Sequence, residues 1–279
     1  MTKGAGRGKA ATRLVVLGEA RGRAPGRVRL VGAGPGDPEL LTLKALKALQ
    51  AAQVVVHDGL VPDEILALAP ADARRISVAK RKSRHSYAQS EINRMLVAFA
   101  LEGLEVVRLK GGDPFIFGRG GEELEACRAA GVECEAIPGV TAALAAGASA
   151  GAPLTHRGAA QAVTFVTGHA ADGQVPDLDW PSLARANHTV AIYMGLTTAG
   201  LIAERLMAAG RDGATPSLIV VDASRPHERR VASTLAGLAA AAQGLEGPAL
   251  LLVGEAMALA QVDAGAYGGY EGAAMEAKA

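Results

Sequence analysis

Asp58 ends an apolar run and stands directly before a glycine. The preceding residues, Val54 to His57, read VVVH, a pattern that predicts a buried strand. Open α/β sheets bind ligands beyond the carboxyl ends of their strands, so a carboxylate placed there can reach a ligand. Asp58 is therefore a candidate for accepting a proton from a bound molecule. The alternative is a local role, because aspartates also form turns at strand ends.

A second aspartate follows two glycines after another predicted strand. The run LEVVRLK (104–110) leads into Gly111, Gly112 and Asp113. Residues without side chains let a flat ligand pack on bare backbone, and Asp113 can accept hydrogen bonds from a ligand's hydroxyl or amine groups. Asp113 also precedes Pro114, which suits a cap on a short helical turn, and the two roles are compatible.

A third glycine-rich segment, GAGPGD (32–37), joins a predicted strand to a predicted helix. Backbone amides and a helix N-terminus at such a junction can bind a nucleotide-like group. The segment does not fit the G-x-G-x-x-G pattern, because Asp37 occupies the place of the third glycine, so a standard dinucleotide site is disfavoured. Pro35 has a fixed φ and no amide to donate, which suits a residue that shapes a wall. The alternative is a tight strand-to-helix turn.

Charged residues gather on two segments. AKRKSRHS (79–86) carries five potential cations between a predicted strand and a predicted helix. A charge run is usually a solvated face, but this one also suits a ligand with several carboxylates or phosphates. Glu122 and Glu123 fall in the first turn of the next predicted helix, where the helix dipole favours acids, and we interpret them as structural.

The remaining reactive residues give weaker signals. Met194 precedes Gly195 in the run IYMG, at the end of a predicted strand. It could lay a polarizable thioether against a ligand, although a core position is the commoner role. Cys127 and Cys134 have no second pair and no neighbouring histidine, so we predict thiols rather than a metal site or a disulfide. No serine or cysteine lies in a nucleophile motif.

The elements that position these residues alternate between strand and helix. Apolar runs and helical spacing predict an α/β layered domain over 27–137 and a second over 138–260. Within the first, one helix is expected over DPELLTLKALKALQAAQ (37–53). Residues 1–26 are rich in Lys, Arg, Gly and Ala and are expected to form a disordered basic extension, and 261–279 a flexible tail.

Composition narrows the classes of partner. The formal net charge is +1, so no global field favours nucleic acid, and neither a basic stripe nor an aromatic platform is present. The longest apolar run, AIPGVTAALAAGASAGAPL (136–154), is interrupted by proline and glycine and suits a buried helix better than a membrane span. We expect no membrane segment, no metal and a cytoplasmic location.

Eight segments, taken in order, resemble the tetrapyrrole methylases, and within that family the branch that acts on uroporphyrinogen III. They are VRLVGAGPGDPELLTLKAL, HDGLV, AKR, RLKGGDPFIFGRGGEE, PGVTAA, PLTHRG, VTFVTGH and IYMG. The match runs from about residue 28 to residue 257, nearly all of the chain between its two ends.

The resemblance implies two α/β domains of the class III methyltransferase type, with S-adenosylmethionine in the cleft between them, and a homodimer. It implies methylation of uroporphyrinogen III at C2 and C7, through precorrin-1 to precorrin-2, for siroheme or cobalamin synthesis. Asp58 and Lys80 would be the acid–base residues. The cofactor site would be lined by Pro35, Gly111, Gly112, Asp113, Ile116, Thr141, Ala142, Met194 and Ala223. The local cations Arg81, Arg108 and Arg119 would meet the carboxylates of the substrate.

The sequence departs from the family's pattern beside the acid–base residues. His57, Gly59 and Ala79 stand where family members commonly have tyrosine, often arginine, and glycine. Two other functions stay open: another precorrin methylase of the same family, or a non-catalytic module that binds S-adenosylmethionine. The additional module of bifunctional siroheme synthases is not expected in a chain of 279 residues.

Overall fold

The first sheet is parallel and lies between two layers of helices. The computed structural model describes residues 24–79, 87–170 and 174–262. The strands run in the order β3-β2-β4-β1-β5, and every pairing is parallel. Their bounds are β1 Arg27–Gly32, β2 Val54–His57, β3 Arg74–Ser77, β4 Glu105–Lys110 and β5 Glu133–Ile137. Because the strands are parallel, the loops that follow β1, β2 and β4 leave the same edge of the sheet.

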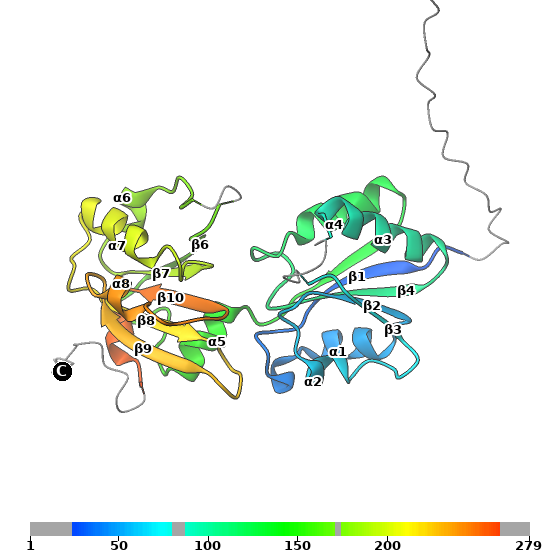
Figure 1. The fold of residues 1–279 in the computed structure, drawn as a ribbon, viewed down its shortest axis with the longest axis horizontal. Coiled ribbons are helices and arrows are strands. Elements are labelled where there is room, and N and C mark those ends of the chain that lie inside the picture. The colour runs from blue at the N-terminus through cyan, green and yellow to red at the C-terminus, as the bar shows by residue number, and fades with distance from the viewer. Residues whose placement is uncertain (1–23, 80–86, 171–173, 263–279) are drawn as a thin grey trace, which may run out of the picture.

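Alternate side chains of these strands enter two separate cores. Val31, Val55 and Leu109 pack against α1 (Leu43–Gln50) and α2 (Asp63–Leu66). Residues one or three positions away face the other side, where Val28, Val56 and Val106 meet the helices α3 and α4. These helices span Gln89–Leu101 and Gly120–Ala129. Figure 1 shows the two helical layers on opposite faces of the sheet. This is the period-two pattern of a sheet covered on both faces.

The helix expected over residues 37–53 is divided into two elements. Pro38–Leu40 forms a short 3-10 helix, η1, and α1 begins only at Leu43. Each start has its own cap: Asp37 Oδ1 accepts from Glu39 N at 2.8 Å, and Thr42 Oγ1 accepts from Ala45 N at 3.1 Å. A threonine with extended backbone at the N-cap starts a new helix, which the apolar spacing alone did not reveal.

The second sheet is mixed. Its order is β6-β7-β10-β8-β9; β6 and β7 are parallel and the other pairs antiparallel. The bounds are β6 Ala162–Thr167, β7 His188–Tyr193, β8 Pro216–Val221, β9 Arg229–Thr234 and β10 Ala249–Val253. The pairing of β8 with β9 makes a hairpin whose loop, 222–228, extends toward the first sheet (Figure 1).

Helices also cover both faces of the second sheet. One core forms with α6 (Trp180–Leu183), α7 (Ala199–Ala208) and α8 (Leu238–Ala241). The opposite core is rich in alanine and forms with α5 (Ala142–Ser149) and the 3-10 helix η2 (Glu255–Leu259). The α/β class and the two sheets confirm the prediction, whereas the boundary at residue 138 stays a prediction. Within the described residues no helix is long and apolar enough to cross a membrane.

Candidate active site

The glycine loops after β1 and β4 are joined backbone to backbone. Gly112 N donates to Gly34 O at 2.7 Å, and Gly34 N donates to Gly112 O at 3.2 Å. Gly112 has φ +67°, a conformation that disfavours a side chain. A Cβ on Gly32 would lie 2.5 Å from Gly139 N, so the segment after β5 also packs against bare backbone. The structure therefore brings three strand ends together around residues without side chains.

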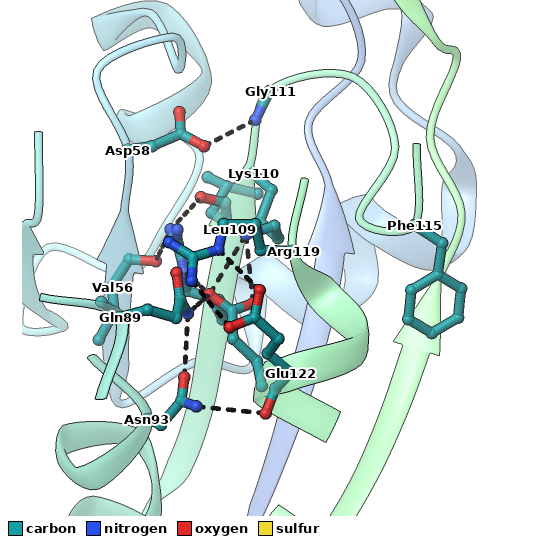
Figure 2. Close-up of polar contacts among 12 residues, drawn as sticks. Val56, Asp58, Gln89, Asn93, Leu109, Lys110, Gly111, Phe115, Arg119 and Glu122 are labelled. Atoms are coloured by element: carbon teal, nitrogen blue, oxygen red, sulfur yellow. Dashed lines mark hydrogen bonds and ion pairs between the residues drawn. The ribbon is translucent and has the colours of Figure 1, made fainter. Parts of the chain in front are cut away.

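Asp58 lies beside these glycines. It follows β2 and is partly buried, and its Oδ1 accepts from Leu60 N at 2.9 Å. Its Oδ2 accepts from Gly111 N at 3.2 Å, a contact drawn in Figure 2. The turn role considered from the sequence is present, and the carboxylate also reaches the β4 loop. A carboxylate has about four lone-pair sites, so both oxygens can accept a further hydrogen bond or a proton.

Asp113 fixes the loop that follows β4. Its Oδ1 accepts from Phe115 N at 2.8 Å, which is the local capping role expected from its place before Pro114. Its Oδ2 accepts from Gly139 N at 3.1 Å and so ties the β4 loop to the segment after β5. Asp113 therefore holds two segments in place, and its role toward a cofactor stays a prediction.

Tyr193 joins the second sheet to the start of α5. Its hydroxyl lies 2.6 Å from Thr141 Oγ1 and accepts from Ala143 N at 3.2 Å. Burial raises the pKa of the Tyr193 phenol above its usual value, so the hydroxyl stays protonated near neutral pH. The ring also lies 4.9 Å, centroid to centroid, from that of Phe117, which belongs to the β4 loop. Tyr193 thus contacts both the first residues of α5 and the glycine loop.

The remaining predicted cofactor residues lie around this junction. Met194 follows Tyr193 with φ +55° and is 51% exposed. Ile116 is partly exposed within the β4 loop, and a Cβ on Gly112 would lie 3.9 Å from Ala142 N. The structure brings these residues and Thr141 to one region.

Pro35 and Ala223 are connected to the same region by one side chain. Pro35 is buried after β1, and Ala223 is buried after β8. Arg225, in the β8–β9 loop two residues after Ala223, donates from Nε to Pro35 O at 3.2 Å. The two predicted residues therefore belong to segments in direct contact, although they stand far apart in sequence.

Arg108 is buried in an ion-pair network rather than exposed at the strand end. It is 4% exposed, Lys110 3% and Glu123 0%. Glu123 Oε1 accepts from Arg108 Nε at 2.9 Å, and Lys110 Nζ lies 3.2 Å from both carboxylate oxygens. Glu123 therefore has a structural role, because it pairs with two buried cations of β4. The contact of Arg108 with substrate stays a prediction.

The same network perturbs a lysine directly before the glycine loop. Burial, and then the neighbouring Arg108 cation, hold the pKa of Lys110 below its usual value, while Glu123 opposes the shift. Gln89 Nε2 adds a hydrogen bond to Glu123 Oε1 at 3.2 Å. Figure 2 shows Gln89 and Asn93 reaching from α3 toward α4. The base of the β4 loop is therefore fixed by charge as well as by packing.

Of the other predicted cations, Arg119 falls within the described residues. Arg119 is exposed with φ +60°, and its Nε donates to Glu122 Oε1 at 2.7 Å, so it is paired at the start of α4 (Figure 2). This hydrogen bond lowers the pKa of Glu122. Lys80 and Arg81 fall in 80–86, outside the described residues, so their placement is not tested.

An open cavity of about 530 Å³ borders the segments that carry the predicted cofactor residues. It lies between η1, α5 and the β8–β9 loop, with Leu40, Leu144, Arg225 and Glu228 among its walls. None of the predicted cofactor residues lines it. Across the described residues, no three His, Cys, Asp or Glu side chains are grouped as metal ligands. The predicted cofactor residues lie at the junction of strand-end loops, so this junction is the candidate site, and the cavity lies beside it.

Sequence reasoning missed two residues that organise the site, Tyr193 and Arg225. Tyr193 carried a signal, because an aromatic hydroxyl at the end of an apolar strand needs a partner when it is buried. Arg225 carried none, because the arginine stands in the turn-rich segment DASRP and its partners lie 165 and 190 residues away.

Comparisons with known proteins bear on the family to which the chain belongs. A family model described as Tetrapyrrole (Corrin/Porphyrin) Methylases matches residues 27–239. The chain is 52% identical, over 264 residues, to the uroporphyrinogen-III C-methyltransferase of Paracoccus denitrificans (strain Pd 1222), covering 94% of this chain and 92% of that relative. It is also 52% identical, over 242 residues, to siroheme synthase 1 of Yersinia enterocolitica, covering 86% of this chain and 51% of that relative. The chain thus spans about half the length of that siroheme synthase.

One solved structure adds a ligand to the comparison. The uroporphyrin-III C-methyl transferase of Thermus thermophilus, solved as a complex with S-adenyl homocysteine, is 44% identical to this chain. The two superpose with a TM-score of 0.71, covering 83% of this chain and 93% of that one.

Proposed function

Because the chain belongs to the tetrapyrrole methylase family, we propose that it methylates uroporphyrinogen III with S-adenosylmethionine, at C2 and then at C7, to give precorrin-2. The single observation that carries the proposal is the 52% identity to a uroporphyrinogen-III C-methyltransferase along nearly the whole of both chains. The convergence of bare strand ends around Asp58 and Asp113 supports it independently.

The junction offers groups whose chemistry suits S-adenosylmethionine. Gly111 and Gly112 present backbone without side chains, and Asp113 presents a carboxylate that can accept from ligand hydroxyls or amines. Thr141 and Met194 would complete the site from the other side, with the thioether of Met194 against the ligand. When bound, the cofactor supplies an electrophilic methyl group on a sulfonium.

The protein's own residues then bind, position and handle a proton. Transfer of a methyl group to carbon needs an in-line approach in a site from which water is excluded, so most of the acceleration comes from positioning. Asp58 accepts, at Oδ1 or Oδ2, the proton that leaves the macrocycle, directly or through water. Its hydrogen bonds from Leu60 N and Gly111 N keep the carboxylate fixed while it does so.

Cations around the site meet the carboxylates of the substrate. Of the predicted cations within the described residues, Arg119 has an exposed guanidinium. Its ion pair with Glu122 is at the surface and therefore weak, so a substrate carboxylate can replace Glu122 at little cost in free energy. Lys80 would take part in acid–base chemistry and Arg81 in substrate binding. Arg108 would act from beneath the loop, because its guanidinium is held by Glu123.

The wider context of the reaction follows from the same proposal. The product would feed siroheme or cobalamin synthesis, and the protein would act as a homodimer in the cytoplasm. The residues around the two sheets would form an N-terminal domain over 27–137 and a C-terminal domain over 138–260, with the site between them.

The test is a direct assay on the full chain. We expect incubation with S-adenosylmethionine and enzymatically generated uroporphyrinogen III to add two methyl groups, seen by mass and absorption spectra of the oxidised product. Methylation only of a later precorrin would instead assign the chain to another methylase of the family. Binding of S-adenosylhomocysteine by calorimetry without any transfer would indicate a non-catalytic module.

A further inference from the structure

Arg225 crosses from the second sheet to two loops of the first. It stands in the β8–β9 loop, and its guanidinium donates from Nε to Pro35 O at 3.2 Å and from Nη2 to Leu60 O at 2.6 Å. Its Nη1 lies 3.5 Å from Asp222 Oδ1, within its own loop. One side chain therefore joins three segments that are remote in sequence.

The β8–β9 loop is shaped to aim this side chain. Asp222 and Ser224 have φ values of +51° and +61°, which are uncommon for residues other than glycine. The loop is fixed from within, because Ser224 N donates to Glu228 Oε2 and Arg225 N donates to Asp222 O at 3.0 Å. A strained backbone of this kind persists only where the surrounding contacts determine it.

The receiving surface also matches the guanidinium. A Cβ on Gly36 would lie 2.6 Å from Arg225 Nε, so only a glycine leaves room for the side chain there. The flat, forked donor set of arginine can reach two carbonyl oxygens at once, which the single ammonium of a lysine cannot do in the same way.

Both contacted carbonyls belong to loops of the candidate site. Leu60 N donates to Asp58 Oδ1, and Asp58 Oδ2 in turn accepts from Gly111 N, so the residue that Arg225 holds also orients the candidate proton acceptor. Pro35 follows Gly34, whose backbone pairs with Gly112. Arg225 is thus linked through backbone contacts to the proton-accepting carboxylate and to the cofactor wall.

We propose that Arg225 is a positioning residue that holds the Asp58 loop and the Pro35 loop at a fixed distance from the second sheet. The inference rests on the proposed function and deepens it. Arg225 acts through the backbones of Leu60 and Pro35, and it keeps the proton acceptor and the methyl donor in one relative geometry.

The expected effect lies mainly on turnover. A misplacement of about 1 Å in a reacting geometry can cost roughly 10²-fold in rate. Arg225→Gln should therefore lower kcat by about 10- to 100-fold, while the Kd of S-adenosylhomocysteine rises only a few-fold. The kcat of Arg225→Lys should lie between those of the wild type and Arg225→Gln, because the ammonium can reach one carbonyl but not both.

Arg229→Gln is the matched control. Arg229 is exposed on β9, four residues along the same hairpin, and removal of its side chain takes away the same charge. The three variants and the wild-type chain are compared by kcat, KM for uroporphyrinogen III, calorimetric Kd for S-adenosylhomocysteine and melting temperature. The kinetic assays are run at a temperature well below the lowest of the four melting temperatures.

A double-mutant cycle separates positioning from mere stability. If Arg225 acts through the Asp58 loop, Arg225→Gln should lower kcat much less in an Asp58→Asn background than in the wild type. Equal effects in both backgrounds, or a kcat of Arg225→Gln equal to that of Arg229→Gln, would overturn the inference even if the melting temperature falls. If Arg225→Gln does not fold, an unchanged kcat in Arg225→Lys overturns it instead.

The failure of the proposed function looks different. In that case the wild-type chain itself adds no methyl group to uroporphyrinogen III, whatever happens at Arg225. A wild type that methylates, with no loss in the Arg225 variants, counts against the inference alone.

Discussion

Glu123→Gln should cost the fold far more than a surface acid does. The substitution removes the carboxylate that holds Arg108 at 2.9 Å and Lys110 at 3.2 Å, and all three side chains are almost fully buried. The amide that replaces it carries no charge, and half of it is a donor that faces other donors. Two cations on the same face of β4 would then remain in the interior without a counter-charge.

The magnitude follows from this geometry. Removing one partner of a buried ion pair typically costs about 3–5 kcal/mol, because the other charge stays desolvated. The free energy of unfolding of a protein is usually only about 5–15 kcal/mol, so the loss would be a large share of the total. The carboxylate oxygen Oε2 makes no hydrogen bond with the described residues, so the hydrogen bonds from Arg108, Lys110 and Gln89 all go to Oε1.

The pH dependence gives the prediction a second, independent arm. The folded-state pKa of Lys110 is below its usual value, so the unfolded chain binds this proton more tightly and stability rises with pH between the two values. Loss of Glu123 removes the charge that opposes the shift, so the folded pKa falls further. The destabilisation by Glu123→Gln should therefore be largest near neutral pH and shrink as pH approaches about 10.

The assay is urea unfolding followed by circular dichroism at several pH values. Glu122→Gln is the matched control, because it removes the neighbouring acid from an exposed pair with Arg119 and should cost at most about 1 kcal/mol. The reasoning is wrong if the two variants have the same midpoint at neutral pH. It is also wrong if the loss caused by Glu123→Gln does not change with pH.

Three further predictions concern the candidate site itself. Asp58→Asn should lower kcat by about 10²- to 10⁴-fold with little change in S-adenosylhomocysteine affinity. Its control is Asp212→Asn, which removes a carboxylate from the same kind of turn elsewhere and should leave turnover unchanged. Asp113→Ala should weaken S-adenosylhomocysteine binding in calorimetry and lower stability by about 1–3 kcal/mol, because two backbone donors lose their acceptor. Its control is Asp179→Ala, which removes the N-cap of α6 and should lower stability alone. Tyr193 has a raised folded-state pKa. Its protonated hydroxyl therefore adds to the free energy of unfolding below about pH 10, and this contribution is lost as pH rises through the folded-state pKa. Tyr193→Phe should abolish that alkaline loss in urea unfolding, and an unchanged loss would contradict the assignment.

Local patterns determined most of the elements and the chemistry of the loops. The strands Arg27–Gly32 and Glu105–Lys110 were visible as apolar runs, and the loops after them as glycines, because burial and backbone freedom are properties of short segments. The sequence also placed Asp58 and Asp113 at strand ends. It did not separate η1 from α1, because the apolar spacing continues across Thr42 and only the capping hydrogen bond marks the new start.

Only the tertiary structure decided which of these residues act together. Arg108 looked available to a ligand, but the period of the strand points it, like Lys110, at α4, where Glu123 holds both side chains. In the sequence, Arg225 lies in a turn-rich segment with no sign of a special role. In the structure, the β8–β9 hairpin places it against carbonyl oxygens 165 and 190 positions away. The physical reason is that a local run of residues encodes burial and backbone shape, whereas the partner of a charged side chain depends on how distant elements pack.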